Sequence, residues 1–546
     1  MLKKIILITA FLFLSIQAAE ASKTFDQAYQ DINDKMLRQD IQILASDEFE
    51  GRLPSTEGEV KTINYLTERF KTMGLIPANG DSYLQSVPLV EITADRAMAL
   101  KISGKTYTYV DQFVAWTTRV VEKVSVADSE LVYVGYGIVA PEYNWNDYEG
   151  IDVKGKTVVM LVNDPGYATQ DDKLFNGNAM TYYGRWTYKY EEAARQGAAA
   201  VLLVHQTAPA SYPWGVIEGW TGPQFDLVAS DNNMSRVPVE AWIHIDVAHE
   251  LFQRAGLNFQ EQEKAALSKS FKAVPMNLKA SIDISNKISK SSSNNVAAII
   301  PGSTNPDEYI IYTAHWDHLG VNPNVEGDQI YNGAMDNASG TAALLSLAQS
   351  YMDLKKRPER SILFLALTAE EQGLLGSGYY GQNPLVPTAK SIAGINMDVL
   401  NMAGPMKDMI VVGFGKSELE EYARHATEKQ GRKLVAEATP ESGSFYRSDH
   451  FNLAKYGVPM LYAGGGTSHR ELGEKHVIAF NDDYDTNRYH KPSDEYNPDW
   501  DFTGAVEDLQ VYFQIGHELA TSDVVPNWYK SAEFRAIRDK NLKSAK

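Results

Sequence analysis

Three apolar runs near the middle of the chain each end in acidic or imidazole side chains, and this arrangement limits the possible folds more than any other feature. The runs cover residues 309–314, 361–367 and 391–397, and their β-branched and aromatic residues are typical of buried strands. A helical pattern lies between the first two runs, at residues 341–354. Strands that alternate with helices predict an α/β fold.

Candidate metal ligands follow each of these runs. His315 comes after the first run, Glu370 and Glu371 after the second, and Asp398 after the third, while Asp336 precedes the helical pattern. Open α/β sheets bind ligands at the carboxyl ends of their strands, so we expect these groups to meet there. Alone, each could be a helix cap or a solvated turn residue. Together, imidazole and carboxylate groups indicate a hydrolytic site for divalent metal ions.

The order and spacing of these groups are more specific than their chemistry. The chain contains, in order, His315-x-Asp317, Asp336-Asn337-Ala338-Ser339-Gly340, Glu370-Glu371-Gln372-Gly373, Asp398 and Tyr489-His490-Lys491-Pro492-Ser493-Asp494. This set resembles the M28 family of two-zinc peptidases. The resemblance implies that Asp336 bridges two Zn²⁺ ions, that His315 and Asp398 complete the first site, and that Glu371 and His490 complete the second. It also implies a cis peptide bond after Asp336.

The resemblance assigns roles to groups beside the metals as well. Glu370 would be the general acid–base that takes a proton from the attacking water and passes it to the leaving amine. Asp317 would orient His315 through the second nitrogen of its ring. Apart from the resemblance, a phenol or guanidinium near the site would stabilise the oxyanion. Tyr489 and Tyr446 are candidates, and the sequence does not choose between them.

The implied reaction is hydrolysis of the N-terminal bond of a peptide by an aminopeptidase. Three alternatives stay open. A carboxypeptidase would need a cation for the terminal carboxylate, which Arg447 could supply. An enzyme of the glutaminyl-cyclase type would have the same fold and one zinc, and a receptor-like binding protein would have no working site.

The length of 546 residues predicts more than one domain. A strand–helix–strand pattern within residues 131–204 resembles the protease-associated domain that some M28 peptidases carry as an insertion. A Ser/Asn/Lys-rich stretch at residues 289–295 is the expected exit linker. The peptidase domain should have a mixed sheet with helices on both faces, and the insertion should be β-rich. The predicted segments are a signal peptide (1–21), the first part of the peptidase domain (22–125), the insertion (126–285), the main part of the peptidase domain (286–525) and a C-terminal tail (526–546).

The first 21 residues have the features of a signal peptide. Lys3 and Lys4 precede an apolar core at residues 5–16, and Ala19-Glu20-Ala21 is a small-x-small cleavage pattern. The apolar core is shorter than the ~20 residues of a spanning helix. We therefore expect cleavage after Ala21, a periplasmic or secreted protein, and no stable membrane insertion afterwards.

Composition excludes some classes of partner and site. The chain has no cysteine, which excludes disulfides and thiolate zinc sites. Its formal charge of -19 argues against a nucleic-acid partner, because phosphate binding needs a basic surface. Peptides are the expected substrates, and the sequence leaves the oligomeric state open.

Overall fold

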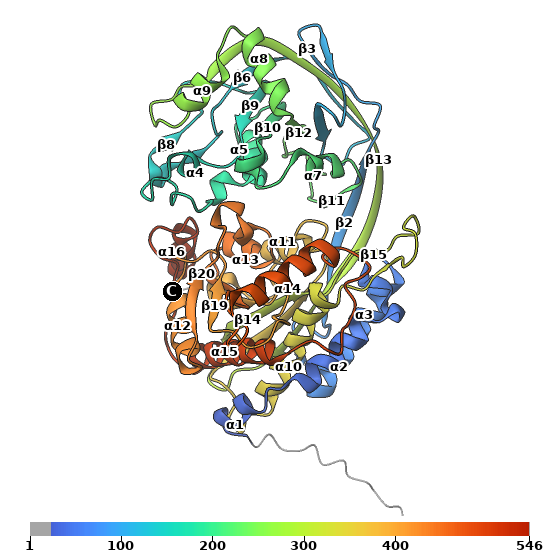
Figure 1. The fold of residues 1–546 in the computed structure, drawn as a ribbon, viewed down its shortest axis with the longest axis vertical. Helices are drawn as coiled ribbons and strands as arrows, with labels where there is room; N and C mark the ends of the chain where they lie inside the picture. The colour runs from blue at the N-terminus through green and yellow to red at the C-terminus, as the bar shows by residue number, and fades with distance from the viewer. Residues whose placement is uncertain (1–22, 545–546) are drawn as a thin grey trace, which may run out of the picture.

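The computed structural model describes residues 23–544 and contains two lobes, one above the other in Figure 1, that a long two-stranded ribbon joins. The predicted signal peptide, residues 1–21, lies outside the described residues. Among the residues that are described, no helix is both long enough and apolar enough to span a membrane.

A mixed sheet forms the centre of the lower lobe, as predicted. Its strands lie in the spatial order β13 (Val274–Ile300), β17 (Arg360–Leu367), β14 (Asn305–His315), β18 (Ser391–Asn396), β21 (Met460–Gly464), β19 (Asp408–Val411) and β20 (Lys433–Ala436). The strands β17, β14, β18 and β21 run parallel, whereas β13 and β19 pair antiparallel with β17 and β21. The three apolar runs of the sequence are therefore neighbouring parallel strands.

Helices cover both faces of this sheet, which also agrees with the prediction. One face carries α2 (Asp34–Leu44), α3 (Glu57–Met73), α10 (Gly340–Met352) and α15 (Thr503–Ala520), and the other carries α11 (Leu375–Gln382) and α13 (His450–Lys455). Successive side chains of a strand point to opposite faces, so Ile310 packs with the first set and Ile311 with the second. Because both faces are covered, the strands are continuous apolar runs.

The upper lobe has its own sheet and two hydrophobic clusters. Its parallel strands are β6 (Lys123–Tyr133), β9 (Thr157–Leu161), β10 (Ala200–Val204) and β12 (Val239–Ile243), and β5 (Phe113–Trp116) pairs antiparallel with β12. The helices α5 (Trp186–Arg195) and α8 (Ile245–Arg254) contribute buried residues to these clusters.

The upper lobe begins earlier than we predicted. We placed its start at residue 126, but β3 (Leu100–Ile102) and β5 already belong to the upper sheet. Leu100 and Phe113 are buried in its core. Strands as short as three or four residues carry too little periodic pattern to be assigned from the sequence, which explains the error.

Residues of the predicted C-terminal tail are buried in the lower lobe. Trp528 and Arg538 are fully buried, and α16 (Arg535–Ser544) ends the described chain. Arg538 donates hydrogen bonds to the backbone oxygens of Ser391 and Ile392, at 2.8 and 3.0 Å. The segment therefore ties down the start of β18.

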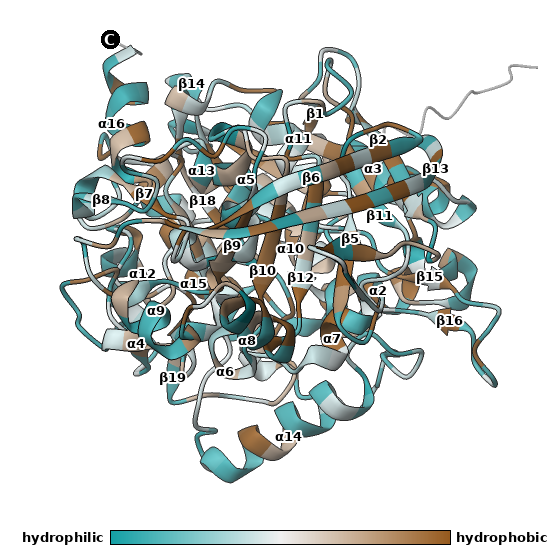
Figure 2. Cartoon of the chain, turned by 90° about the horizontal axis from the view of Figure 1, so that it is seen from above, coloured by the Kyte–Doolittle hydropathy of each residue, from teal (hydrophilic) through white to brown (hydrophobic). Residues whose placement is uncertain are grey.

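The ribbon between the lobes consists of β2 (Leu84–Ala94) and the second half of β13. The two strands pair antiparallel from Leu84 with Val296 to Ala94 with Asn286, and Figure 2 shows them side by side. Residues 289–295, which we predicted to be a linker, are thus part of a continuous strand. Their polar composition fits the ribbon because residues 289–292 are exposed to solvent.

A short strand of the upper lobe reaches the lower one. β11 (Gln224–Leu227) pairs with β2, and Leu227 packs against Ala369 and Leu375 in a small hydrophobic cluster. Since Ala369 directly precedes Glu370, the upper lobe supports the loop that carries two of the candidate site residues.

Candidate metal centre

The structure brings the five predicted metal ligands together at the carboxyl-terminal edge of the lower sheet. His315 is the last residue of β14, Glu371 follows β17, Asp398 follows β18, Asp336 precedes α10, and His490 follows α14 (Glu474–Asn487). The peptide bond after Asp336 is cis, as predicted. Strand ends that lie next to each other in the sheet thus deliver groups that are far apart in the sequence.

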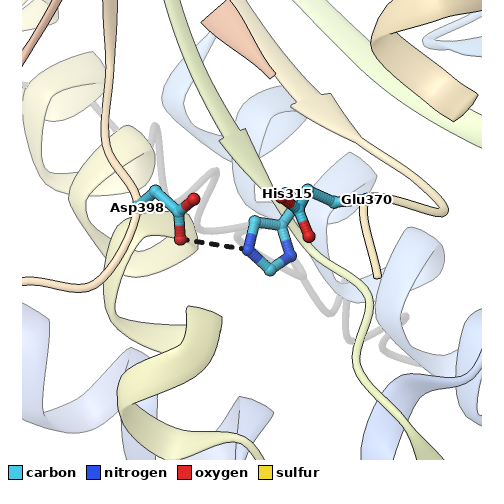
Figure 3. Close-up of side chains that lie close together, drawn as sticks. All are labelled: His315, Glu370 and Asp398. Atoms are coloured by element: carbon cyan, nitrogen blue, oxygen red, sulfur yellow. Dashed lines mark hydrogen bonds and ion pairs between the residues drawn. The ribbon is translucent and has the colours of Figure 1, made fainter. Parts of the chain in front are cut away.

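The first group of ligand atoms surrounds His315. Figure 3 shows the imidazole of His315 between the carboxylates of Asp398 and Glu370, and the ligand atoms of these three residues lie within 4.8 Å of one another. The Nε2 atom of His315 lies 3.2 Å from Asp398 Oδ1 and 3.3 Å from Asp336 Oδ1. These atoms could share one ion.

The ligand atoms of His318, Asp336 and Glu371 form a second group and lie within 4.8 Å of one another. His490 lies next to this group. Its Nε2 atom lies 2.9 Å from Glu371 Oε2 and 3.2 Å from Asp336 Oδ2. Asp336 therefore presents one carboxylate oxygen to each group, which is the arrangement of a bridging ligand between two ions.

Spacing and charge both fit a pair of zinc ions. Four tetrahedral ligands at zinc–ligand bonds of about 2.0–2.2 Å lie roughly 3.3–3.6 Å apart. The four contacts above, at 2.9 to 3.3 Å, are close to this spacing and slightly shorter. The cluster contains the four carboxylates of Asp336, Glu370, Glu371 and Asp398 and the three imidazoles of His315, His318 and His490. Such an excess of buried negative charge is costly unless cations bind there.

Glu370 has a different environment from Glu371. Burial, together with the negative charge of Asp398 and Glu371, raises the pKa of Glu370 well above its ordinary value. Glu370 is also close enough to His315 and Asp398 to be a ligand of the first ion. The geometry therefore allows two roles for this carboxylate, ligand or proton carrier.

Asp317 holds the turn that carries these two glutamates. It is fully buried, and its carboxylate accepts hydrogen bonds from the backbone N–H groups of Glu370 and Glu371, at 3.1 and 3.3 Å. We predicted that this carboxylate orients His315, but its Oδ1 atom is 3.8 Å from His315 Nδ1, whereas the backbone oxygen of Asp317 is 3.2 Å away. The backbone oxygen therefore orients the ring, and the carboxylate positions the glutamates.

Two further groups, the carboxylate of Asp494 and the hydroxyl of Ser448, support the ligands. Asp494 is fully buried and accepts hydrogen bonds from the backbone N–H groups of Met335 and Asp336. Ser448 donates a hydrogen bond of 2.6 Å to Asp398 Oδ2. Asp494 is part of the motif Tyr489-His490-Lys491-Pro492-Ser493-Asp494, and this position four residues after His490 is the signal in the sequence.

Arg52 is buried beneath the site, a position that nothing in its local sequence predicted. Its guanidinium donates hydrogen bonds to the backbone oxygens of Trp316, Asn332 and Gly333, at 2.6 to 2.8 Å, and to that of Leu44. Burial lowers the pKa of Arg52 to about 10. This residue joins the loop after β14 to the loop before Asp336.

The structure separates the two tyrosines that we proposed for the oxyanion. The ring of Tyr489 stacks on that of His490, with centroids 3.9 Å apart. Tyr446 lies elsewhere: its hydroxyl donates to Glu533 and accepts a hydrogen bond from Lys416. The Tyr446 alternative is therefore wrong, because its hydroxyl already belongs to a different buried network.

Part of the chain resembles known peptidases. Residues 295–514 match the sequence model of Peptidase family M28. Aminopeptidase NAALADL1 of Mus musculus is 34% identical over 130 residues, which are 23% of this chain and 16% of that protein. A probable zinc metalloprotease of Pyrenophora teres f. teres (strain 0-1) is 38% identical over 106 residues, 19% of this chain and 22% of that protein.

Longer matches have lower identity. The Glutamate carboxypeptidase 2 homolog of Caenorhabditis elegans is 23% identical over 382 residues, 63% of this chain and 46% of that protein. The chain thus spans less than half the length of these three curated relatives. The aminopeptidase from Aneurinibacillus sp. strain AM-1 has the same fold, with a TM-score of 0.51, 19% identity, and coverage of 92% of this chain and 98% of that one. Residues 295–514, the part of this chain that matches Peptidase family M28, include all five candidate ligands.

Proposed function

We propose that this protein is a zinc-dependent aminopeptidase that hydrolyses the N-terminal bond of peptides at a two-zinc centre. The observation that carries the proposal is the position of Asp336, whose two carboxylate oxygens lie 3.3 and 3.2 Å from His315 and His490. A carboxylate between two imidazoles on opposite sides suits a pair of ions better than one ion.

Each residue of the site has a part in this reaction. Zinc ions bound at this centre supply Lewis acidity toward the attacking water and the scissile carbonyl. Glu370 takes a proton from the attacking water and passes it to the leaving amine, and its partly buried position favours both steps because it limits the access of bulk water. Asp317 keeps Glu370 in place through the backbone N–H of that residue. Tyr489 donates a hydrogen bond to the oxyanion as the tetrahedral centre forms.

The negative charge of the cluster also suits a free amino terminus. A substrate ammonium is attracted to a buried site with more carboxylates than imidazoles, whereas a terminal carboxylate is repelled. The relative in Mus musculus and the Aneurinibacillus protein, which shares the fold, are both described as aminopeptidases. The test compares an aminoacyl p-nitroanilide with the same compound acetylated at its amine. Cleavage of the free amine alone supports the proposal, and equal cleavage of both contradicts it.

A carboxypeptidase is the second candidate, and one exposed cation favours it. Arg447 is exposed and directly precedes Ser448, which bonds to Asp398. It could therefore pair with a substrate carboxylate near the site. Release of the last residue from an N-acetylated peptide with a free C-terminus, abolished by Arg447→Ala, would favour this function over the first.

We also propose that the upper lobe is a protease-associated domain and that the protein is exported. The parallel strands of the upper lobe support the first proposal, and the basic, apolar and Ala-Glu-Ala stretches of residues 1–21 support the second. Intact-mass measurement of protein from the periplasm or the medium tests export. A mass that corresponds to a chain beginning at Ser22 supports it, and a mass that includes Met1 contradicts it.

A further inference from the structure

His318 is a buried imidazole beside the metal centre with no role in the proposed reaction. It follows β14 by three residues, and its side chain is fully buried. Its Nδ1 atom lies 2.6 Å from Glu371 Oε1. Among the described residues, its Nε2 atom has no hydrogen-bond partner. A buried polar atom without a partner is costly. The contact with Glu371 is therefore the interaction that explains an imidazole at this position.

His318 belongs to a group of possible metal ligands with Asp336 and Glu371, but its short contact favours a hydrogen bond over shared metal coordination. If His318 and Glu371 Oε1 were ligands of one zinc ion at bonds of about 2.0–2.1 Å, a separation of 2.6 Å would close the angle at the metal to about 80°. A tetrahedral ion prefers an angle near 109°, and the contacts of His490 and His315 are longer, at 2.9 to 3.3 Å. The contact of His318 is instead that of a charge-assisted hydrogen bond.

The two oxygens of Glu371 thus have separate partners. Oε1 faces His318 Nδ1, and Oε2 faces His490 Nε2. We propose that His318 is a positioning residue for the second metal site: its Nδ1–H holds Oε1 of Glu371 and leaves Oε2 as the single ligand atom. This proposal rests on the two-zinc centre described above and adds a residue that fixes how Glu371 binds.

The surrounding backbone prevents the ring from turning into the site. A Cβ atom at Gly333 would lie 2.5 Å from Cγ and Cδ2 of His318, so the backbone of Gly333 lies directly against the ring. Arg52 in turn holds the backbone oxygen of Gly333 at 2.8 Å, and the backbone N–H of His318 donates to the backbone oxygen of Arg52. The imidazole is therefore fixed with Nδ1 toward Glu371.

Two variants of His318 test this proposal, one with a side-chain hydrogen-bond donor and one without. Asn has an amide nitrogen near the position of Nδ1, whereas Phe keeps the ring volume and has no donor. Zinc per chain is measured by mass spectrometry over a series of buffered free zinc concentrations. His318→Phe should weaken the second zinc by about 10- to 100-fold and keep the first, as is usual when a hydrogen bond to a ligand is lost. His318→Asn should recover most of that loss.

His205→Phe is the matched control, because it replaces a buried imidazole of the upper lobe whose partner is the backbone oxygen of Tyr212. It should bind both zinc ions like the wild type. The proposal is overturned if His318→Phe binds the second zinc normally, or if His318→Asn is as weak as His318→Phe. If His318→Phe fails to fold, His318→Asn is compared with the wild type instead. The proposal then requires that His318→Asn bind the second zinc with close to normal affinity.

Cobalt substitution separates positioning from coordination without any substrate. The visible absorption of bound Co²⁺ depends on its ligands, so fully loaded His318→Asn should have the spectrum of the wild type. A changed spectrum would show that His318 coordinates the ion, and would overturn the proposal. Wild-type protein that binds only one zinc would contradict the two-zinc centre itself, whichever peptides it cleaves.

Discussion

The carboxylate of Asp494 accepts a hydrogen bond of 3.1 Å from the backbone N–H of Asp336, the residue that lies between the two groups of ligands. A second bond of 3.0 Å comes from the backbone N–H of Met335, and Tyr484 donates a third from its hydroxyl. Asp494 therefore fixes the backbone that aims the bridging carboxylate. It acts from a distance of 158 residues along the chain.

Replacement of Asp494 should consequently weaken the binding of both zinc ions. Asp494→Asn keeps the size of the side chain but turns an amide N–H toward a backbone N–H, so one hydrogen bond is lost. We expect zinc affinity to fall by about 10- to 100-fold at both sites, measured by competition with a chelator. Asp483→Asn is the control, because Asp483 is half exposed on α14 and pairs only with nearby groups, Arg488 among them. A loss confined to one zinc would contradict this account of Asp494.

Removal of Glu371 should have a different effect, limited to the second site. Glu371→Ala deletes a ligand next to His490 but leaves His315 and Asp398 in place. One zinc should remain bound at low free metal, and activity should partly return when excess zinc is added. Zinc content and kcat are measured together over a zinc titration. Loss of both ions at once would mean that the ligand sets are assigned wrongly.

Arg52 should matter for stability, because four backbone oxygens depend on it. Arg52→Met fills much of the same volume but leaves these oxygens without their donor, so we expect a loss of about 3 kcal/mol or more. The matched control is Arg38→Met, whose guanidinium also reaches backbone oxygens but is partly exposed. The apparent midpoint of thermal unfolding should fall clearly further for Arg52→Met. Equal shifts in the two variants would contradict the prediction.

The upper lobe contains a carboxyl group that should make its stability depend on pH. Glu240 is buried beside Trp116 and Thr118, and burial raises its pKa from 4.5 to about 7. The folded protein therefore binds this proton more tightly than the unfolded chain does. The contribution of this proton binding to the free energy of unfolding is complete below about pH 4 and is lost as the pH rises through about 7.

Glu240→Gln stays uncharged, so it should gain stability relative to the wild type as the pH rises from 5 to 8, by at most about 3 kcal/mol. Apparent unfolding midpoints at both pH values measure the gain. A difference between variant and wild type that is the same at pH 5 and pH 8 would contradict the assignment.

The strands and ligands of the lower lobe could be predicted because each apolar run is long and ends in a chemically distinct group. His315, Glu371 and Asp398 follow such runs directly, and the motif around Asp336 fixed its place before a helix. His490 was accessible only through its motif, because it follows α14, of which only Val477 and Tyr484 are buried.

The supporting residues could not be predicted in the same way. His318, Arg52 and Asp494 act mainly through hydrogen bonds to atoms far away in sequence, and no local pattern marks such partners. The ribbon was missed for a related reason. Residues 289–292 are polar because they face solvent, and a polar strand has the composition of a linker.

The most direct test of the central claim is the zinc content and turnover of Glu370→Gln. Gln keeps the size and polarity of the side chain but cannot take up a proton. If Glu370 is the proton carrier, both zinc ions should remain bound, KM should change little, and kcat should fall by about 10²- to 10⁴-fold on an aminoacyl p-nitroanilide. Loss of a zinc ion would make Glu370 a ligand, and near-normal turnover would exclude it as the base; either result would contradict the account.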